Sequence, residues 1–219
     1  MRVVLEIGPK GKKVVAGAVD WPGLDRSGND EDAALEKLTA YVERYQPVAQ
    51  RAGLAAEFTR QRALDVIERY PGNTSTDYWG IAHVPSGNEQ EPLAPDDLEH
   101  RLTLLQAAWE HFDEVSARVS ADLRKGPRGG GWTRAELVRH VHVNETEQFT
   151  RKVGVRTPRE VVLTPDGRAT HHAATLDAIR EANAEGRKVG RSWTLPFLIR
   201  RMAHHVMDHA WEMEDRDLS

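Results

Sequence analysis

The stretch RMAHHVMDHAWEMEDR, residues 201–216, decides how the C-terminal half of the chain is interpreted. It carries His204, His205 and His209, three of the ten histidines of the chain, within six positions. Apolar residues recur at helical spacing through this stretch and ahead of it, which predicts a helix over 194–215. On such a helix, His205 and His209 lie four positions apart on neighbouring turns of one face. Two imidazoles at this spacing can bind one transition-metal ion.

A catalytic metal usually has three protein ligands and one open position, so a third ligand is needed. The segment RHVHVNETE at 139–147 offers candidates on a second predicted helix. His140 borders the apolar side of that helix, and His142 could serve in its place. Antiparallel packing of the two helices would bring either imidazole against the pair, but the spacing does not fix their relative heights.

A simpler explanation exists for each of these histidines taken alone. Imidazoles near a helix C-terminus interact favourably with the helix dipole and bond to terminal carbonyl groups. His204 shares a different face with Asp208, from which a metal on the flank of the helix could also be bound. The combination of an H-x-x-x-H pair with a third imidazole on a neighbouring helix favours a metal site at the pair, with His204 as a bystander.

The composition limits the other classes of function. Hydrophobic residues make up 39% and charged residues 29%, values typical of globular proteins, and the net charge of −4 gives no general attraction to nucleic acid. Because the chain has no cysteine, any metal must be held by nitrogen and oxygen ligands. The sequence has no apolar signal core at its N-terminus and no run approaching the ~18 apolar residues of a membrane span. We therefore expect a cytoplasmic protein without nucleic-acid or membrane partners.

The first ninety residues predict a small α+β domain, 1–90. Short β-branched runs alternate with turn-forming segments, and one long stretch has apolar residues at helical spacing. The expected elements are strands at 3–7, 14–19, 63–70 and 78–84 and a helix at 31–51. This order suggests a small sheet with one helix packed against it.

Downstream of a proline-containing linker or ordered loop at 85–97, the pattern becomes predominantly helical. The glycine-rich segment GPRGGG at 126–131 interrupts it, and a threonine and a glutamate three residues apart form a capping box ahead of the second helix. Helices are expected at about 97–123, from 133 onward, at 169–185 and at 194–215, with an irregular connection at 154–167. These four helices predict an all-α four-helix bundle over 97–216.

Two of these stretches together resemble a known family. GWTRAELVRHVHVNETEQF (131–149) followed by LPFLIRRMAHHVMDHAWEMEDR (195–216) is similar to the DinB/YfiT-like superfamily. Members are four-helix bundles that bind a metal ion through one histidine of the second helix and an H-x-x-x-H pair of the last. The resemblance covers about 97–216.

The resemblance implies site residues and a class of chemistry. Mapped residue by residue, it places an acidic residue at Glu145 and metal ligands at His140, His205 and His209. It implies a divalent metal such as zinc or nickel. Characterised members include transferases and isomerases that use an external low-molecular-weight thiol, and metal-dependent hydrolases.

The N-terminal segment VDWPGLDRSGNDEDAALEKL (19–38) is similar to the HicB-like small α+β fold. HicB-like proteins often carry a separate DNA-binding domain, but the chain has no basic recognition helix. We therefore expect an accessory domain that shapes or covers the bundle or pairs two chains as a homodimer.

Three functions follow as hypotheses. The first is a metal-dependent transferase or hydrolase acting on a small molecule, with Glu145 as proton acceptor or as support for the ligands. The second is a non-enzymatic bundle that binds a ligand or partner, with a structural metal or none; a fourth protein ligand such as Glu212 would favour it. The third, a HicB-type regulator that binds DNA or a toxin, rests on the N-terminal resemblance alone.

Overall fold

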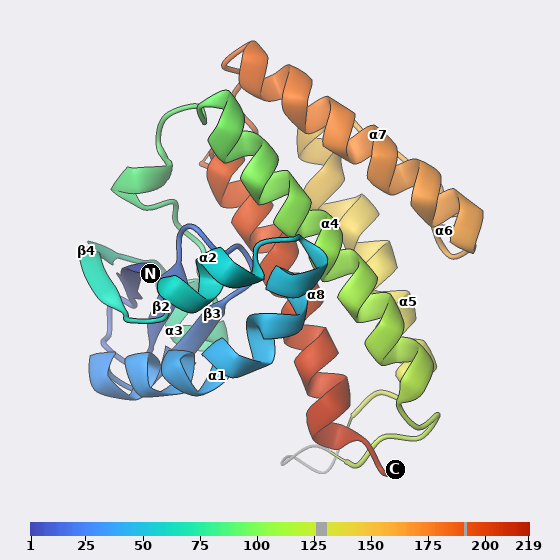
Figure 1. Cartoon of the computed structure of the whole chain (residues 1–219), viewed down its shortest axis with the longest axis horizontal. Helices are drawn as coiled ribbons and strands as arrows, with labels where there is room; N and C mark the ends of the chain where they lie inside the picture. Colours follow the sequence, from blue (N-terminus) through green and yellow to red (C-terminus); the bar gives the residue numbers. More distant parts are fainter. Residues whose placement is uncertain (126–130, 191) are drawn as a thin grey trace.

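The computed structural model describes residues 1–125, 131–190 and 192–219. The N-terminal part forms a four-stranded sheet in the order β3-β2-β1-β4 (Figure 1). β1 pairs antiparallel with β2, with Val3 opposite Ala18, and parallel with β4. The strands are β1 Arg2–Ile7, β2 Val14–Ala18, β3 Asp25–Gly28 and β4 Asp65–Pro71.

Three of the four strands predicted for the N-terminal part are confirmed, and the fourth prediction is wrong. The strands expected at 3–7, 14–19 and 63–70 are present as β1, β2 and β4, whereas 78–84 is not a strand. A short helix, α3 Thr74–Trp79, occupies the start of that region. Asn73 caps the helix through the backbone N–H groups of Ser75 and Thr76, and Gly80 ends it at φ 66°. Local capping therefore overrides the β preference of the aromatic residues at 78 and 79.

The helix expected at 31–51 is confirmed as α1 Glu31–Arg51. Asp30 begins it by accepting a hydrogen bond of 2.8 Å from the backbone N–H of Ala33. The buried face of α1 contacts β2 and β3, and Tyr45 donates a hydrogen bond of 2.7 Å to the carbonyl of Pro22. A second short helix that the sequence did not predict, α2 Ala55–Arg60, connects α1 to β4.

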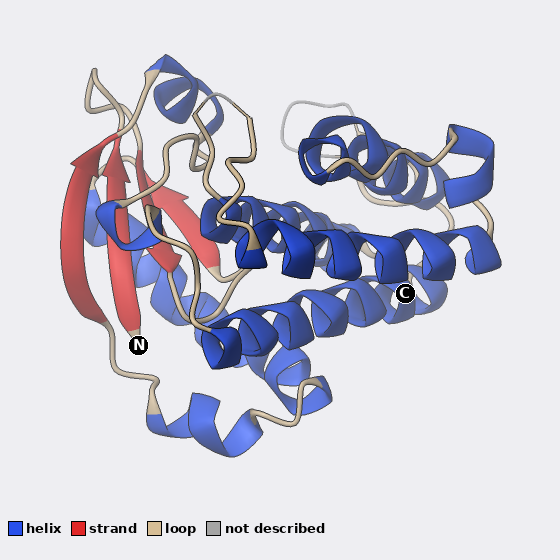
Figure 2. Ribbon diagram, turned by 90° about the horizontal axis from the view of Figure 1, so that it is seen from above, coloured by secondary structure: helices blue, strands red, loops and turns tan. Residues whose placement is uncertain are grey.

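Long helices form the rest of the described chain. α8 packs along α4 and contacts both α5 and α7, and Figure 2 shows the sheet at one end of this helical part. The helices are α4 Pro95–Arg118, α5 Arg134–Asn144, α6 Arg159–Val162, α7 Pro165–Ala184 and α8 Leu195–Arg216. All four expected helices are present, although the first ends at Arg118, and the connection at 154–167 contains the single-turn helix α6. The interruption predicted at GPRGGG lies almost wholly outside the described residues.

α5 does not end cleanly at Asn144. It continues into a π-helical turn, η2 Glu145–Phe149, and a 3-10 turn, η3 Thr150–Val153. Such π turns insert one residue into the helical register and occur frequently at functional sites. Gly154, at φ 88°, then ends the segment in a conformation that glycine adopts without strain.

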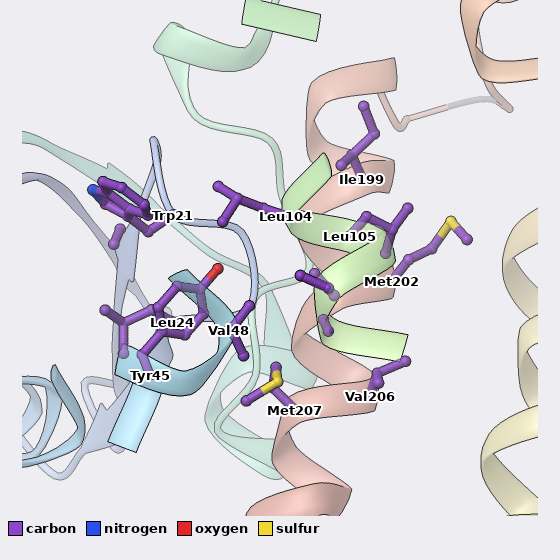
Figure 3. Packing of buried hydrophobic residues seen from close by; sticks show 14 of the residues in the cluster. Trp21, Leu24, Tyr45, Val48, Leu104, Leu105, Ile199, Met202, Val206 and Met207 are labelled. Atoms are coloured by element: carbon purple, nitrogen blue, oxygen red, sulfur yellow. The ribbon is translucent and has the colours of Figure 1, made fainter. Parts of the chain in front are cut away.

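One hydrophobic cluster runs from the sheet into the helices (Figure 3). Trp21, Leu24 and Tyr45 from the N-terminal part and Leu105 and Met202 from the helical part all belong to it. α8 is buried around most of its circumference, as expected for a helix with packing partners on several sides. Within the described ranges, none of the helices combines the length and the apolar character needed to cross a bilayer.

A buried ionic network joins α8 to the sheet. Arg200 donates from Nη1 to Asp25 Oδ1 at 2.7 Å, and from Nε and Nη2 to the two oxygens of Glu89 at 2.7 and 2.9 Å. All three side chains are at most 2% exposed. Glu89 lies in η1 Gly87–Glu89, so the connection predicted at 85–97 contains an ordered, partly buried segment. Breaking such a pair leaves a buried charge without compensation, which is strongly destabilising.

We expect Arg200→Leu to lower the free energy of unfolding by about 3–5 kcal/mol, because Asp25 and Glu89 lose their buried counter-ion. Urea unfolding followed by circular dichroism measures the change. The control is Arg180→Leu, which removes an exposed pair with Glu99 and should cost less than about 1 kcal/mol. Equal losses in the two variants would show that the network does not hold α8 to the sheet.

Candidate metal centre

His140 is placed on α5 by a well-defined helix start. Thr133 donates from its backbone N–H and its hydroxyl to Glu136, at 2.8 and 2.9 Å, and accepts from the Glu136 N–H at 3.3 Å. This reciprocal capping fixes the first turn of α5. Leu137 and Val141 are fully buried, so His140 lies between them at the edge of the apolar face.

His205 and His209 come from α8, at the boundary of its buried stripe. Met202, Val206 and Met213 are each at most 1% exposed, whereas His205 and His209 are only partly buried. The four-residue spacing places the two imidazoles on successive turns, with ring centroids 4.9 Å apart and the rings edge-on at 86°.

The structure brings His140, His205 and His209 together, as the sequence predicted. One ring nitrogen from each can be chosen so that all three lie within 4.8 Å of one another. The Nε2 atoms of His140 and His205 are 3.4 Å apart, and the ring of His140 is centred 4.9 Å from that of His209. Nitrogens at ~2.0–2.1 Å from one ion are separated by about 3–4 Å, so the group can hold a metal with small adjustments.

The protonation of two of these imidazoles suits metal binding. Burial, reinforced by the neighbouring His209, lowers the pKa of His140 from 6.5 to about 4. Burial together with the two other imidazoles also lowers the pKa of His205 well below 6.5. Since a metal binds the neutral imidazole, both side chains are in the ligating form at neutral pH.

A chain of hydrogen bonds that begins at Nδ1 of His209 orients its ring. Its Nδ1 lies 2.9 Å from Glu212 Oε2, and Arg216 Nη1 donates to Glu212 Oε1 at 2.5 Å. Arg216 in turn donates to the backbone carbonyls of Trp132 at 2.8 Å and Arg124 at 2.7 Å. A carboxylate on Nδ1–H selects the tautomer whose Nε2 lone pair is free for a metal. Glu212, whose role the sequence left open, therefore supports a ligand and lies outside the three-nitrogen group.

Asn144 lies against the ring of His140. Its amide nitrogen is 3.1 Å from Nδ1 and 3.0 Å from Nε2 of that ring. An atom at nearly equal distances from both ring nitrogens lies over the face of the ring, outside the direction in which Nδ1–H donates. The buried Nδ1 of His205 has no hydrogen-bond partner in the described part of the chain.

The two alternative ligands lie elsewhere. His142 turns toward α4, where its ring packs edge-on against Phe112 and its Nε2 is 4.0 Å from Asp113 Oδ1. His204 is buried on another face of α8, and within the described ranges neither of its ring nitrogens has a hydrogen-bond partner. Neither imidazole belongs to the three-histidine group.

Glu145 is not brought into the group either. It is buried at the start of the π turn, and its Oε2 lies 3.2 Å from Nε2 of His172 on α7. The ring of His172 stacks on Trp109 of α4 with centroids 3.8 Å apart and planes at 3°. Burial raises the pKa of Glu145, but the attraction of His172 and two other histidines outweighs it, so the net pKa is lowered. The Glu145 carboxylate therefore links the end of α5 to α7. A role for Glu145 in proton transfer at the metal stays a prediction.

The sequence did not predict this second polar cluster, which also contains His171. His171 is 1% exposed and its Nδ1 lies 2.7 Å from the hydroxyl of Thr157. The only sequence signal was the adjacent pair His171 and His172 in the third predicted helix, and adjacent residues face different directions on a helix.

A shallow depression of about 260 Å³ opens beside His140. Of the three histidines of the metal group, His140 lines it, whereas His205 and His209 do not. Its lining consists of Trp132, Glu136, Arg139, His140, Val143, Asn144 and Arg159.

Comparisons with protein-family models, with curated proteins and with solved structures gave no match to this chain. The geometry of the site is therefore the basis for its proposed function.

We expect Glu212→Ala to weaken metal binding by roughly 10- to 100-fold, because His209 loses the acceptor that fixes its tautomer. Competition with a chromophoric chelator measures the dissociation constant. Glu214→Ala is the control, since Glu214 pairs with Arg44 and Arg118 and touches none of the three histidines through a hydrogen bond. Unchanged affinity in Glu212→Ala would contradict a supporting role for this carboxylate.

Proposed function

We propose that the chain is a metal-dependent enzyme of the DinB/YfiT-like type, a small-molecule transferase or hydrolase with a three-histidine divalent metal centre. The observation that carries the proposal is the convergence of His140, His205 and His209 from two helices. In this proposal α4, α5, α7 and α8 are the four helices of a DinB-like bundle, and zinc or nickel is the metal.

The surroundings of the three histidines fit a metal ion. The Nε2 atoms of His140 and His205 face each other across 3.4 Å, a separation that fits two nitrogens bound to one ion. Two neutral imidazoles placed in this way leave lone pairs unsatisfied unless a cation or a proton lies between them. Three protein ligands also leave a coordination position open, as in catalytic rather than structural sites.

The residues of the chain have distinct tasks in this scheme. His140, His205 and His209 bind the metal, and Glu212 accepts the hydrogen bond from Nδ1 of His209. A divalent ion held by neutral ligands keeps its full charge and lowers the pKa of a water or thiol bound to it.

A transferase reaction would need a second molecule. Because the chain contains no cysteine, any thiol in the reaction must come from a separate low-molecular-weight compound. A hydrolase needs only water. The two versions of the proposal therefore differ in whether turnover depends on added thiol.

The alternative is a bundle with a structural metal and no catalysis. A structural site is closed by four protein ligands. Glu212, the nearest candidate for the fourth, is engaged with His209 and Arg216. This arrangement favours the open centre.

Metal analysis of the purified, reconstituted protein tests the proposal. After loading with zinc or nickel and dialysis, mass spectrometry should find about one metal ion per chain, and the double variant His205→Ala, His209→Ala should bind none. The control His142→Ala removes a histidine of the same helix as His140 and should retain the ion. No metal in the wild-type protein, or equal binding by the double variant, would refute the proposed centre.

A further inference from the structure

The depression beside His140 has an aromatic wall. Trp132 is 45% exposed, although tryptophan is usually buried, and its ring is centred 4.4 Å from that of His140. An exposed indole next to a candidate metal ligand provides a flat apolar surface for a bound molecule. The volume of about 260 Å³ corresponds to ~9 water molecules at ~30 Å³ each, so the space suits a small molecule.

The rim of the depression carries two arginines and one carboxylate. Arg139 and Arg159 both line it, and Arg139 forms no ion pair with the described residues. Arg159 pairs with Glu147, which does not line the depression. The one carboxylate in the lining, Glu136, is held by the backbone and hydroxyl of Thr133 in the capping box.

Glu136 stays an anion in the lining and Glu147 pairs with Arg159, so Arg139 is the cation of the lining that has no ion pair with the described residues. The three histidines are neutral ligands, and the charge of Glu212 is matched by Arg216 at 2.5 Å. A divalent ion at the three histidines would add two positive charges beside Arg139. A concave site with an excess of one sign of charge attracts ligands of the opposite sign.

We propose that the substrate of this site is a small organic anion, a carboxylate with a planar apolar body. Its acid group is held by Arg139, with Arg159 as the second cation, and its body rests on Trp132. Guanidinium groups suit this task because their N–H fork matches the two oxygens of a carboxylate. The inference rests on the proposed metal centre and adds the class of substrate.

Titration of the cobalt(II)-loaded protein tests the proposal, since the visible spectrum of the bound cobalt reports events at the metal without any assay of activity. The probes are benzoate, benzyl alcohol and benzylammonium, which share a ring and differ in charge. Isothermal calorimetry on the same samples gives the dissociation constants. Benzoate should bind at least ~10-fold more tightly than the alcohol or the amine, with a change in the cobalt spectrum.

Variants distinguish the contribution of the arginines to benzoate binding from that of the metal. Arg139→Gln should weaken benzoate binding by about 10-fold, with cobalt binding and circular dichroism unchanged, because the side chain is exposed. Arg151→Gln is the matched control: it is also exposed and lies outside the depression. It should bind benzoate as the wild-type protein does.

The possible outcomes distinguish the proposed metal centre from the proposed anionic substrate. A protein that binds no cobalt refutes the metal centre proposed above. A cobalt-loaded protein that binds the three probes equally refutes the anionic substrate alone. If benzoate binds Arg139→Gln as tightly as the wild-type protein, the metal alone holds it. This result refutes the assignment of its carboxylate to the arginine rim.

Discussion

The burial of Arg200 between Asp25 and Glu89 is the constraint on which the rest of the structure depends. A buried guanidinium is costly unless both its charge and its N–H groups are matched, so a shift of α8 against β3 would leave buried charges unpaired. His205 follows Arg200 by between one and two helical turns, and His209 by one turn more. Fixing α8 against the sheet therefore also sets the heights of two of the three imidazoles.

The N-terminal part contributes to the site through this contact. The hydrophobic cluster passes from Trp21 and Tyr45 through to Met202 without interruption, so α8 is packed from the sheet side as well as from α4. The histidines occupy the α8 edge that faces α5. In this account the sheet acts as a rigid support for the metal centre, whereas the depression that receives the substrate is formed by α5, α6 and the segment before them.

Elements with strong local signals could be predicted from the sequence. The long helices and three strands follow from periodicity, and the capping box at Thr133 defined the start of α5. β3 could not be found because DRSG contains no apolar residue; it is buried through charge pairing with α8, a long-range interaction. α3 was missed because its caps outweigh the β preference of the aromatic residues at 78 and 79, which lie at its end.

The site shows the same division between local and long-range information. The spacing of His205 and His209 is a property of one helix and was predictable. For the third ligand the spacing left both His140 and His142 open, and the resemblance to the DinB/YfiT-like superfamily selected His140. The direction in which a carboxylate side chain points can depend on which other helix packs against it. Glu145 faces His172 on α7, which the spacing on one helix cannot show, whereas Glu212 lies three residues after His209 on α8 and its contact with that ring is local.

The most direct test of the central claim is X-ray absorption spectroscopy of the zinc-loaded protein. Three imidazole nitrogens at ~2.0–2.1 Å, one further light atom from a non-protein ligand and no sulfur are the expected shell. The multiple scattering should fit three rings in the wild-type protein and two in His140→Ala. A shell without imidazole scattering, or one with four protein ligands, would contradict an open three-histidine centre.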